Sequence, residues 1–265
     1  MKEFLEKIKP EEKLNNYLKD KKVILVGPSK HLLNSNLGEF IDSFDVVIRF
    51  KWHNTLPLSE WKGGKYVKDI GSKTDIIYGS TVLTSDNGVS MNKAIPYFEK
   101  GNLKHYRVPN NRDLGRFYSN DLECGTTYAE YDVGEYAKEF SRRLGIDELK
   151  VWPQVGFCGL MESIASDCKE VFVTGFTMYH GGGHIFQENK PAWHNQPIVG
   201  KHHGVLEINM LLEAISEANG RIQIDNVLYK ILELHARGIH HDEISQVVEK
   251  IMKEQGKQEE KVIIT

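Results

Sequence analysis

The chain has 265 residues, of which 40% are hydrophobic and 27% are charged. This is the composition of a globular protein that buries a core, in one large or two small domains, without disulfide or metal staples. The net charge of −3 argues against broad nucleic-acid binding, although it leaves room for a local basic groove, and three cysteines (Cys124, Cys158 and Cys168) allow at most one disulfide bridge.

The N-terminal segment, residues 1–20, predicts one short amphipathic helix with apolar side chains on its inner face. The inward side chains are Phe4, Leu5, Ile8, Leu14 and Leu18. This segment is charged and lacks the apolar run of a signal peptide, and no stretch of the chain approaches the roughly 18 apolar residues of a membrane span. We therefore expect a cytoplasmic protein, unless the chain has been trimmed.

Hydrophobic runs predict strands that alternate with helices from residue 22 to residue 220. The expected strands are 22–27, 45–49, 75–78, 103–108, 148–152 and 171–174. The expected helices are 133–144, 159–167 and 205–218. The strand runs are continuously hydrophobic, which is typical of strands covered on both faces. The sequence therefore predicts an α/β fold, a mostly parallel sheet with helices on both sides.

The C-terminal tail, residues 226–265, has a different pattern. It holds two helical stretches split at Gly238 and ends in a stretch rich in lysine and glutamate. We expect a domain over residues 1–225 and a C-terminal helical extension over residues 226–265, with a frayed end. A helix-turn-helix is the alternative, but the mixed charge offers no basic recognition face.

Histidines gather in one segment, since five of the eleven lie between His180 and His203. The segment follows the expected strand 171–174, and loops after the strands of an α/β sheet often carry the chemistry. Histidine is suited to proton transfer near neutral pH. We expect a role in proton transfer or in phosphate contact.

A metal site and a solvated loop without a function are the alternatives for this segment. The candidate metal ligands are His180, His184 and either His194 or His202, with a carboxylate such as Glu188 or Glu207. The glycines between His180 and His184 make that stretch flexible rather than a preformed pair of ligands, which weakens the metal interpretation.

Three polar turns could present backbone N–H groups to an anion. They are Gly27-Pro-Ser-Lys30, Asp69-Ile-Gly-Ser-Lys-Thr74 and Trp152-Pro-Gln-Val-Gly156. Each of them, taken alone, also fits an ordinary turn or helix start.

The order of these motifs resembles glycosyltransferase family 29, the eukaryotic-type sialyltransferase family. Val26-Gly-Pro-Ser29, Ile41-Asp-Ser43, Arg49 and Asp69-Ile-Gly-Ser-Lys-Thr74 are similar to its large motif. Residues 153–176, with Pro153, Gly156, Cys168-Lys-Glu-Val171 and Thr174-Gly-Phe176, are similar to its small motif. His202 and Glu207 match the very small motif, and His184-Ile-Phe resembles the third motif. The resemblance spans roughly residues 22–220.

This resemblance implies a single Rossmann-like domain, a GT-A-like sialyltransferase variant, that uses a CMP-activated 2-keto sugar acid and inverts the anomeric carbon. It implies no metal or other cofactor, and the sequence has no Asp-x-Asp triplet. His202 matches the general base and His184 the group that meets the leaving phosphate, while Glu207 could orient the loop or the following helix. The expected donor-binding residues are Gly27, Ser29, Arg49, Lys51, Ser72, Gly156, Phe157, Tyr179 and His180.

The expected acceptor is a glycan or glycolipid. The residues that would bind it are indicated less specifically than those that would bind the donor. The candidates are His194 and Arg112, and by composition alone Tyr97, Arg107, Asn110 and Asn111. The segment 82–122, which contains several of them, matches no motif.

The chain also departs from the family pattern. Pro28 and Lys51 replace two asparagines, Gln154-Val155 replaces a hydroxyl pair, and Val23 replaces the cysteine that would pair with Cys168. The family's inter-motif disulfide therefore cannot form, in keeping with a reducing compartment. The donor sugar stays open between sialic acid, Kdo and another nonulosonate. A metal-dependent hydrolase and a non-catalytic nucleotide- or glycan-binding homologue are the functional alternatives.

Overall fold

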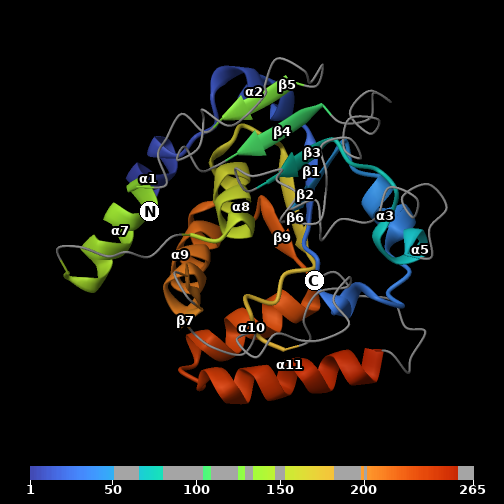
Figure 1. The fold of residues 1–265 in the computed structure, drawn as a ribbon, viewed down its shortest axis with the longest axis vertical. Helices are drawn as coiled ribbons and strands as arrows, with labels where there is room; N and C mark the ends of the chain where they lie inside the picture. The colour runs from blue at the N-terminus through green and yellow to red at the C-terminus, as the bar shows by residue number, and fades with distance from the viewer. Residues whose placement is uncertain are drawn as a thin grey trace, which may run out of the picture.

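A seven-stranded parallel sheet forms the centre of the protein in the computed structural model (Figure 1). The structure describes residues 1–50, 66–79, 104–108, 125–128, 134–146, 153–181, 198–199 and 202–255. The strand order is β5-β4-β3-β2-β1-β6-β9. The strands are β1 (Lys22–Val26), β2 (Val46–Phe50), β3 (Ile76–Tyr78), β4 (His105–Val108), β5 (Gly125–Tyr128), β6 (Glu170–Thr174) and β9 (Ile222–Ile224). All of the pairings between them are parallel.

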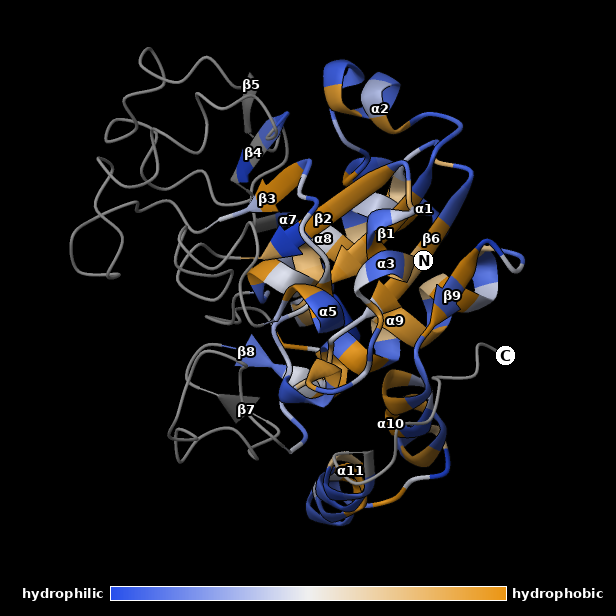
Figure 2. Cartoon of the chain, turned by 90° about the vertical axis from the view of Figure 1, so that its right-hand side faces the viewer, coloured by the Kyte–Doolittle hydropathy of each residue, from blue (hydrophilic) through white to orange (hydrophobic). Residues whose placement is uncertain are grey.

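Helices cover both faces of the sheet. In Figure 1, α8 (Val155–Ala165) and α9 (Gly204–Glu217) lie on one face, with α1 (Lys2–Lys7) and α7 (Gly134–Leu144) beyond them. The short helices α3 (Gly38–Asp42) and α5 (Val67–Ile70) lie on the other. The central strands are apolar and enclosed between these layers (Figure 2), so every residue of β2 is buried. The predicted α/β architecture is confirmed.

The hydrophobic runs predicted five strands correctly, namely β1, β2, β3, β4 and β6. The expected strand 148–152 lies outside the described residues. The sequence did not predict β5 or β9. The first is Gly-Thr-Thr-Tyr, which has no apolar run, and the second is only three residues long.

The N-terminal segment forms two helices, so the prediction of one helix over residues 1–20 was wrong. The helices are α1 (Lys2–Lys7) and α2 (Glu12–Leu18). Pro10 stands between them, and proline has no N–H for the helical ladder and disfavours helical geometry in the residue before it. The predicted inward side chains Phe4, Ile8, Leu14 and Leu18 are buried, and Leu5 is partly buried against the same core.

Two further helices follow the predictions closely, while a third begins early. The expected helix 133–144 is α7 (Gly134–Leu144), and 205–218 is α9. The helix expected over 159–167 begins instead at Val155. Gln154, which precedes it, has extended backbone geometry, so Val155 and Gly156 form the start of the first turn. Within the described residues, no helix is long and apolar enough to cross a membrane.

The C-terminal tail contains the two predicted helices, α10 (Asn226–Ala236) and α11 (His241–Gln255). The chain turns between them at Gly238, whose φ of +74° suits glycine. Val227, Leu228, Ile231 and other apolar side chains of both helices belong to the same hydrophobic core as the sheet. Figures 1 and 2 both place α10 and α11 at the lower end of the molecule.

The topology marks one edge of the sheet as the place for a site. From β1 at the centre, the chain builds β2 to β5 on one side, whereas β6 and β9 lie on the other. The segments that follow β1 and β6 therefore diverge, and in open parallel sheets ligands bind in the crevice at the carboxyl ends of such a pair. Because α8 leads into β6 and α9 leads into β9, both helices begin at this carboxyl edge.

Candidate active site at the carboxyl edge of the sheet

Two glycines lie back to back where β1 and β6 end. The backbone N–H of Gly27 donates to Thr174 O at 2.8 Å, and that of Ser29 donates to Gly175 O at 3.1 Å. A Cβ on Gly27 would lie 2.2 Å from Gly175 O, and a Cβ on Gly175 would lie 2.4 Å from Gly27 O. Only glycines allow the two turns to approach so closely, and the approach leaves Ser29 buried at their junction.

The N-terminus of α8 reaches the same junction. A Cβ on Gly156, in its first turn, would lie 3.0 Å from the ring of Phe176, which directly follows Gly175. The first-turn amides of a helix have no acceptors within the helix, and they carry a partial positive charge. The position is therefore suited to an anionic group such as a phosphate or a carboxylate.

Glu207 joins α9 to this helix start. Its side chain is fully buried, and its Oε1 accepts a hydrogen bond from the backbone N–H of Gln154 at 2.9 Å. Among the described residues, its Oε2 has no hydrogen-bond partner. Burial raises the pKa of Glu207 to about 8, and the bond from Gln154 offsets only part of this effect. At neutral pH the group is therefore mainly protonated and adds little negative charge beside the α8 N-terminus.

His202 lies beside Tyr179. Their rings are stacked, with centroids 6.5 Å apart and planes inclined by 26°. His202 belongs to β8 (His202–His203), which pairs antiparallel with β7 (Ile198–Val199) directly before α9. The neighbouring His203 caps α9, since its Nδ1 accepts from Leu206 N at 3.3 Å. The cap fixes the loop end, and partly exposed His202 faces Tyr179.

The turn that carries Tyr179 has an unusual backbone. Met178 and Tyr179 have φ angles of +47° and +64°, in the left-handed region that side chains other than glycine rarely adopt. Two such residues in succession cost free energy and are typical of turns held in place for a function. Burial raises the pKa of the Tyr179 hydroxyl, and the nearby Glu207 adds to the shift. Tyr179 therefore stays protonated and can donate a hydrogen bond.

His180 faces away from this stack into the C-terminal helices. It is 1% exposed, its Nδ1 lies 3.2 Å from Ser245 Oγ, and its ring centroid lies 4.0 Å from that of His241. Burial lowers the pKa of His180 to about 3, with a further contribution from His241. The side chain is neutral and packed against α11, so it does not reach the carboxyl-edge crevice.

The side chains of three other predicted donor-binding residues are also directed elsewhere. Arg49 is 2% exposed, and its guanidinium donates to Thr74 Oγ1 at 2.9 Å and to backbone carbonyls of the segment before β3. Ser72 precedes β3, at the amino edge of the sheet, and donates to Asp42 Oδ2 at 2.9 Å. The ring of Phe157 is buried in the core against Tyr136 and Phe140.

The remaining predicted site residues, Lys51, Arg112, His184 and His194, lie outside the described residues. The structure therefore brings together Gly27, Ser29, Gly156, Tyr179, His202 and Glu207 at the carboxyl edge.

The sequence reasoning missed two residues of this edge, His31 and Asp225. They are hydrogen-bonded to each other and, through His31, to Ser29. His31 stands two residues after Ser29 in a polar turn, which is a weak signal. Asp225 precedes α10 as its N-cap, a position that predicts a structural role alone.

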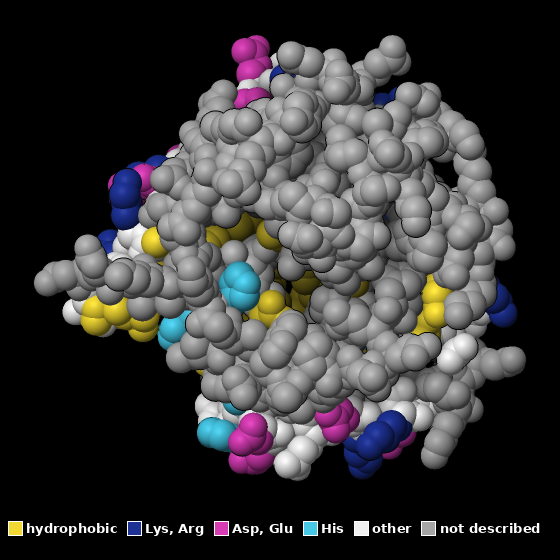
Figure 3. Space-filling model, in the orientation of Figure 1, with side chains coloured by type: hydrophobic (Ala, Val, Ile, Leu, Met, Phe, Trp, Pro, Cys, Tyr) yellow, Lys and Arg dark blue, Asp and Glu magenta, His cyan; other side chains and the backbone are white. Residues whose placement is uncertain are grey.

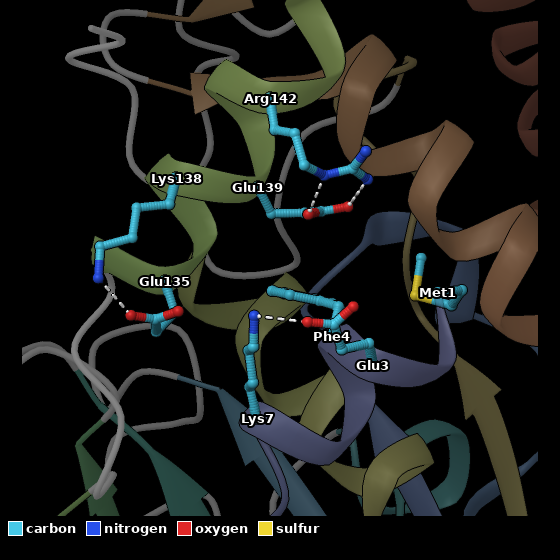
Figure 4. Close-up of a pocket in the computed structure, with 8 residues that line it drawn as sticks. All are labelled: Met1, Glu3, Phe4, Lys7, Glu135, Lys138, Glu139 and Arg142. Carbon is cyan, nitrogen blue, oxygen red and sulfur yellow. Dashed lines mark hydrogen bonds and ion pairs between the residues drawn. The ribbon is translucent and has the colours of Figure 1, made fainter. Parts of the chain in front are cut away.

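Two other polar features lie away from the edge. A surface pocket between α1 and α7 (Figure 4) is lined by Met1, Glu3, Phe4, Lys7, Glu135, Lys138, Glu139 and Arg142. Its charged side chains pair with one another, so they balance within the pocket.

Arg107 is fully buried between two carboxylates, Glu162 and Glu11, and Tyr78 Oη donates to Glu162 at 2.6 Å. Arg107, which was a candidate for the acceptor by composition, is therefore enclosed in the core. Its place in a buried ion cluster is structural.

Figure 3 shows one side of the molecule in the orientation of Figure 1. Among the side chains that it colours, histidines lie beside hydrophobic ones left of the centre, and charged side chains with further histidines lie at the lower end, where α11 lies.

Comparisons with known proteins support the fold and the resemblance of residues 1–102 to one family. The family model described as glycosyltransferase family 29 (sialyltransferase) matches residues 1–102. No curated protein sequence matches the chain. A monofunctional α-2,3-sialyltransferase, Cst-I from Campylobacter jejuni, is 13% identical with a TM-score of 0.50, over 77% of this chain and 75% of that chain.

Two further solved structures are similar to this chain. A variant of the sialyltransferase CST-II in complex with CMP is 14% identical with a TM-score of 0.50, over 77% of this chain and 80% of that chain. A mammalian sialyltransferase is 18% identical with a TM-score of 0.45, over 84% and 76% of the two chains.

The class of protein follows from the sheet topology and the two matches with a TM-score of 0.50. The fold is the Rossmann-like α/β fold of sialyltransferases. The predicted resemblance to glycosyltransferase family 29 is confirmed by the family model, which covers β1, β2 and β3 with the turns between them. This resemblance supports a glycosyltransferase.

Proposed function

We propose that this protein is an inverting glycosyltransferase that moves a sialic acid or a related 2-keto sugar acid from a CMP-activated donor to a glycan hydroxyl. The observation that carries the proposal is the bond between Glu207 and Gln154 N, at 2.9 Å. It joins the very small motif to the small motif, beside the glycine junction that ends the first strand of the large motif. Segments that are far apart in sequence thus meet at the edge where α/β folds bind ligands.

The donor phosphate fits the N-terminus of α8 on electrostatic grounds. The first-turn amides around Gly156 offer hydrogen-bond donors, and the helix dipole favours negative charge there. Protonated Glu207 accepts from Gln154 N without adding a charge that would repel the anion. The same donors would stabilise the charge that develops on the phosphate as CMP departs.

His202 is the proposed general base. Inversion needs a group that removes the acceptor hydroxyl proton while an oxocarbenium-like centre forms. His202 is partly exposed and is stacked on Tyr179, whose hydroxyl stays protonated. The imidazole would then lie beside the acceptor oxygen, and that oxygen would lie beside the anomeric carbon that it attacks.

A ligand-binding experiment tests this proposal. Thermal unfolding of the metal-free protein would be followed with CMP, UMP, AMP and GMP. A ligand that binds only the folded state adds about 2.7 kcal/mol of stability at a hundredfold excess over Kd. Of the four nucleotides, we expect only CMP to raise Tm. In a separate activity assay that contains a chelator, we expect turnover of CMP-sialic acid or CMP-Kdo.

Each contrary outcome points to a specific alternative. The absence of a shift with CMP, together with a shift on addition of zinc or manganese, would contradict the proposal and favour a metal-dependent hydrolase. CMP binding without transfer from either donor to a panel of glycan acceptors would favour a homologue that binds nucleotides without turnover.

A further inference from the structure

A buried hydrogen-bond network connects the turn after β1 to the end of β9. His31 Nε2 lies 2.8 Å from Asp225 Oδ2, and His31 Nδ1 lies 3.1 Å from Ser29 Oγ. The exposed fractions of Ser29, His31 and Asp225 are 4%, 6% and 4%. One imidazole thus joins a predicted donor-binding hydroxyl to a carboxylate that lies 194 positions after His31 along the chain.

Asp225 is firmly anchored. Its Oδ2 also accepts from Thr174 Oγ1 at 2.8 Å and from Gly175 N at 3.0 Å, while its Oδ1 accepts from Leu228 N at 2.8 Å. Burial raises the pKa of Asp225, but the charge and hydrogen bond of His31 and these N–H donors outweigh it, so the pKa lies below its usual value. The carboxylate is ionised and fixed to β6, to the glycine junction and to α10.

The ionised carboxylate determines how His31 is oriented. A carboxylate only accepts hydrogen bonds, so Nε2 must carry a hydrogen and donate it to Asp225. Nδ1 then faces Ser29, where it accepts the hydroxyl hydrogen in the neutral imidazole and donates to Oγ in the imidazolium. In both states this contact holds Ser29 Oγ in place. It leaves the lone pairs of Oγ for a ligand when the imidazole is neutral, and the O–H with one lone pair when it is protonated.

The C-terminal helices support both turns of the candidate site. Asp225 begins α10 and holds the turn after β1 through His31. The helix α11 packs against η1 (Lys30–Leu32), the short 3-10 helix that contains His31. The same helix holds the turn after β6, because Ser245 contacts His180, next to Tyr179. A Cβ on Gly181 would lie 3.1 Å from Val248 of α11.

We propose that His31 is a positioning residue for the donor nucleotide, which acts through the Ser29 hydroxyl and is held in place by Asp225. The inference rests on the proposed function, because it takes the CMP part of the donor as the ligand of Ser29. It also gives the C-terminal helices a part in donor binding, since Asp225 fixes His31 from the start of α10.

A double-mutant cycle on the full chain tests this inference. The Kd of CMP would be measured by calorimetry for wild type, Ser29→Ala, His31→Ala and the double variant. We expect each single change to weaken CMP binding about five- to tenfold, the effect of one lost hydrogen bond. The double variant should bind no more weakly than either single variant, because both changes remove the same interaction.

A second variant covers the case in which His31→Ala does not fold. Asp225→Asn keeps an oxygen to cap Leu228 N and removes the charge opposite His31. It should weaken CMP binding in the wild-type background and leave the Kd of Ser29→Ala unchanged. Ile231→Val in the core of α10 is the control, since it lowers stability without touching the network and should leave the Kd of CMP within about twofold.

The outcomes separate this inference from the proposed function. Three outcomes would each overturn the role of His31 while wild-type CMP binding stood. The first is that the losses in affinity multiply in the double variant, and the second is an unchanged Kd in both His31→Ala and Asp225→Asn. The third is an equal loss of affinity in Ile231→Val. Absence of CMP binding by the wild type would overturn the proposed function and this inference together.

Discussion

Glu207 Oε1 accepts a hydrogen bond from the backbone N–H of Gln154 at 2.9 Å, so the first turns of α8 and α9 are tied by a fully buried carboxyl group. A carboxylate in this place would lack solvent and has one hydrogen bond from the described residues, which explains why burial raises its pKa to about 8. The contribution of Glu207 to the free energy of unfolding therefore depends on pH, and this dependence can be measured.

Glu207→Gln should change how stability varies with pH. The folded state keeps the proton of Glu207 up to about pH 8, whereas the unfolded state releases it near the ordinary value of 4.5. The wild type therefore loses stability as pH rises through this window, by at most about 1.4 kcal/mol per pH unit from this group. Glutamine mimics the protonated acid, so urea unfolding at pH 5, 6.5 and 8 should show a flatter profile for the variant.

Glu243→Gln is the matched control, because Glu243 is an exposed residue of α11. It should leave the pH profile of stability unchanged. A profile of Glu207→Gln that runs parallel to that of the wild type from pH 5 to 8 would show that Glu207 is ionised in the fold.

His202→Ala should lower turnover far more than donor binding. Loss of a general base typically costs 10²- to 10⁴-fold in rate, whereas CMP would contact other groups of the edge. We expect kcat to fall by about this factor and the Kd of CMP to stay within about twofold. His240→Ala, at a largely exposed histidine, should leave both unchanged. Equal kcat in wild type and His202→Ala would remove His202 from the chemistry.

His180→Asn should make the protein less sensitive to acid. The pKa of His180 is lowered to about 3 by burial and by His241, so the folded state stays neutral while the unfolded state takes up a proton below about 6.5. The wild type therefore loses stability as pH falls from 6.5 toward 3, and asparagine removes this contribution.

The groups that face His180 are His241 and Ser245 of α11, with His235 of α10 contributing a smaller effect. Chemical unfolding at several pH values between 4 and 7 would measure the slope, with His240→Asn as the exposed control. An identical slope in wild type and His180→Asn would contradict the assignment of a neutral buried histidine.

Local sequence patterns were sufficient for most of the fold. The continuous apolar runs of β1, β2 and β6 identify strands covered on both faces, and the break at Gly238 separates α10 from α11. Pro10 was a visible signal for the end of the first helix, but the apolar spacing on both sides of it favoured a single one. Short strands such as β9 depend on their neighbours more than on their own three residues.

The candidate site was predictable only as far as motifs identify it. Gly27, His202 and Glu207 stand in recognisable patterns, but the contact between His31 and Asp225 joins segments that no spacing connects. The sequence also cannot show that Arg49 donates to Thr74 and the backbone before β3, since a motif fixes which residue is present and leaves the direction of its side chain open. The left-handed backbone at Tyr179 likewise follows from tertiary contacts.

Gly175→Ala should be the most damaging single-methyl change at the site. Gly175 has a φ of +79°, and its added Cβ would lie 2.4 Å from the backbone oxygen of Gly27, which cannot move without displacing β1. Gly238→Ala is the matched control, because its φ of +74° carries the same backbone cost while nothing lies within 4 Å of the new methyl group. We expect a loss of about 1–2 kcal/mol for Gly238→Ala and of about 3 kcal/mol or more for Gly175→Ala. Urea unfolding of both variants measures the difference, and equal losses would mean that the two turns separate readily and that the junction beneath Ser29 is not rigid.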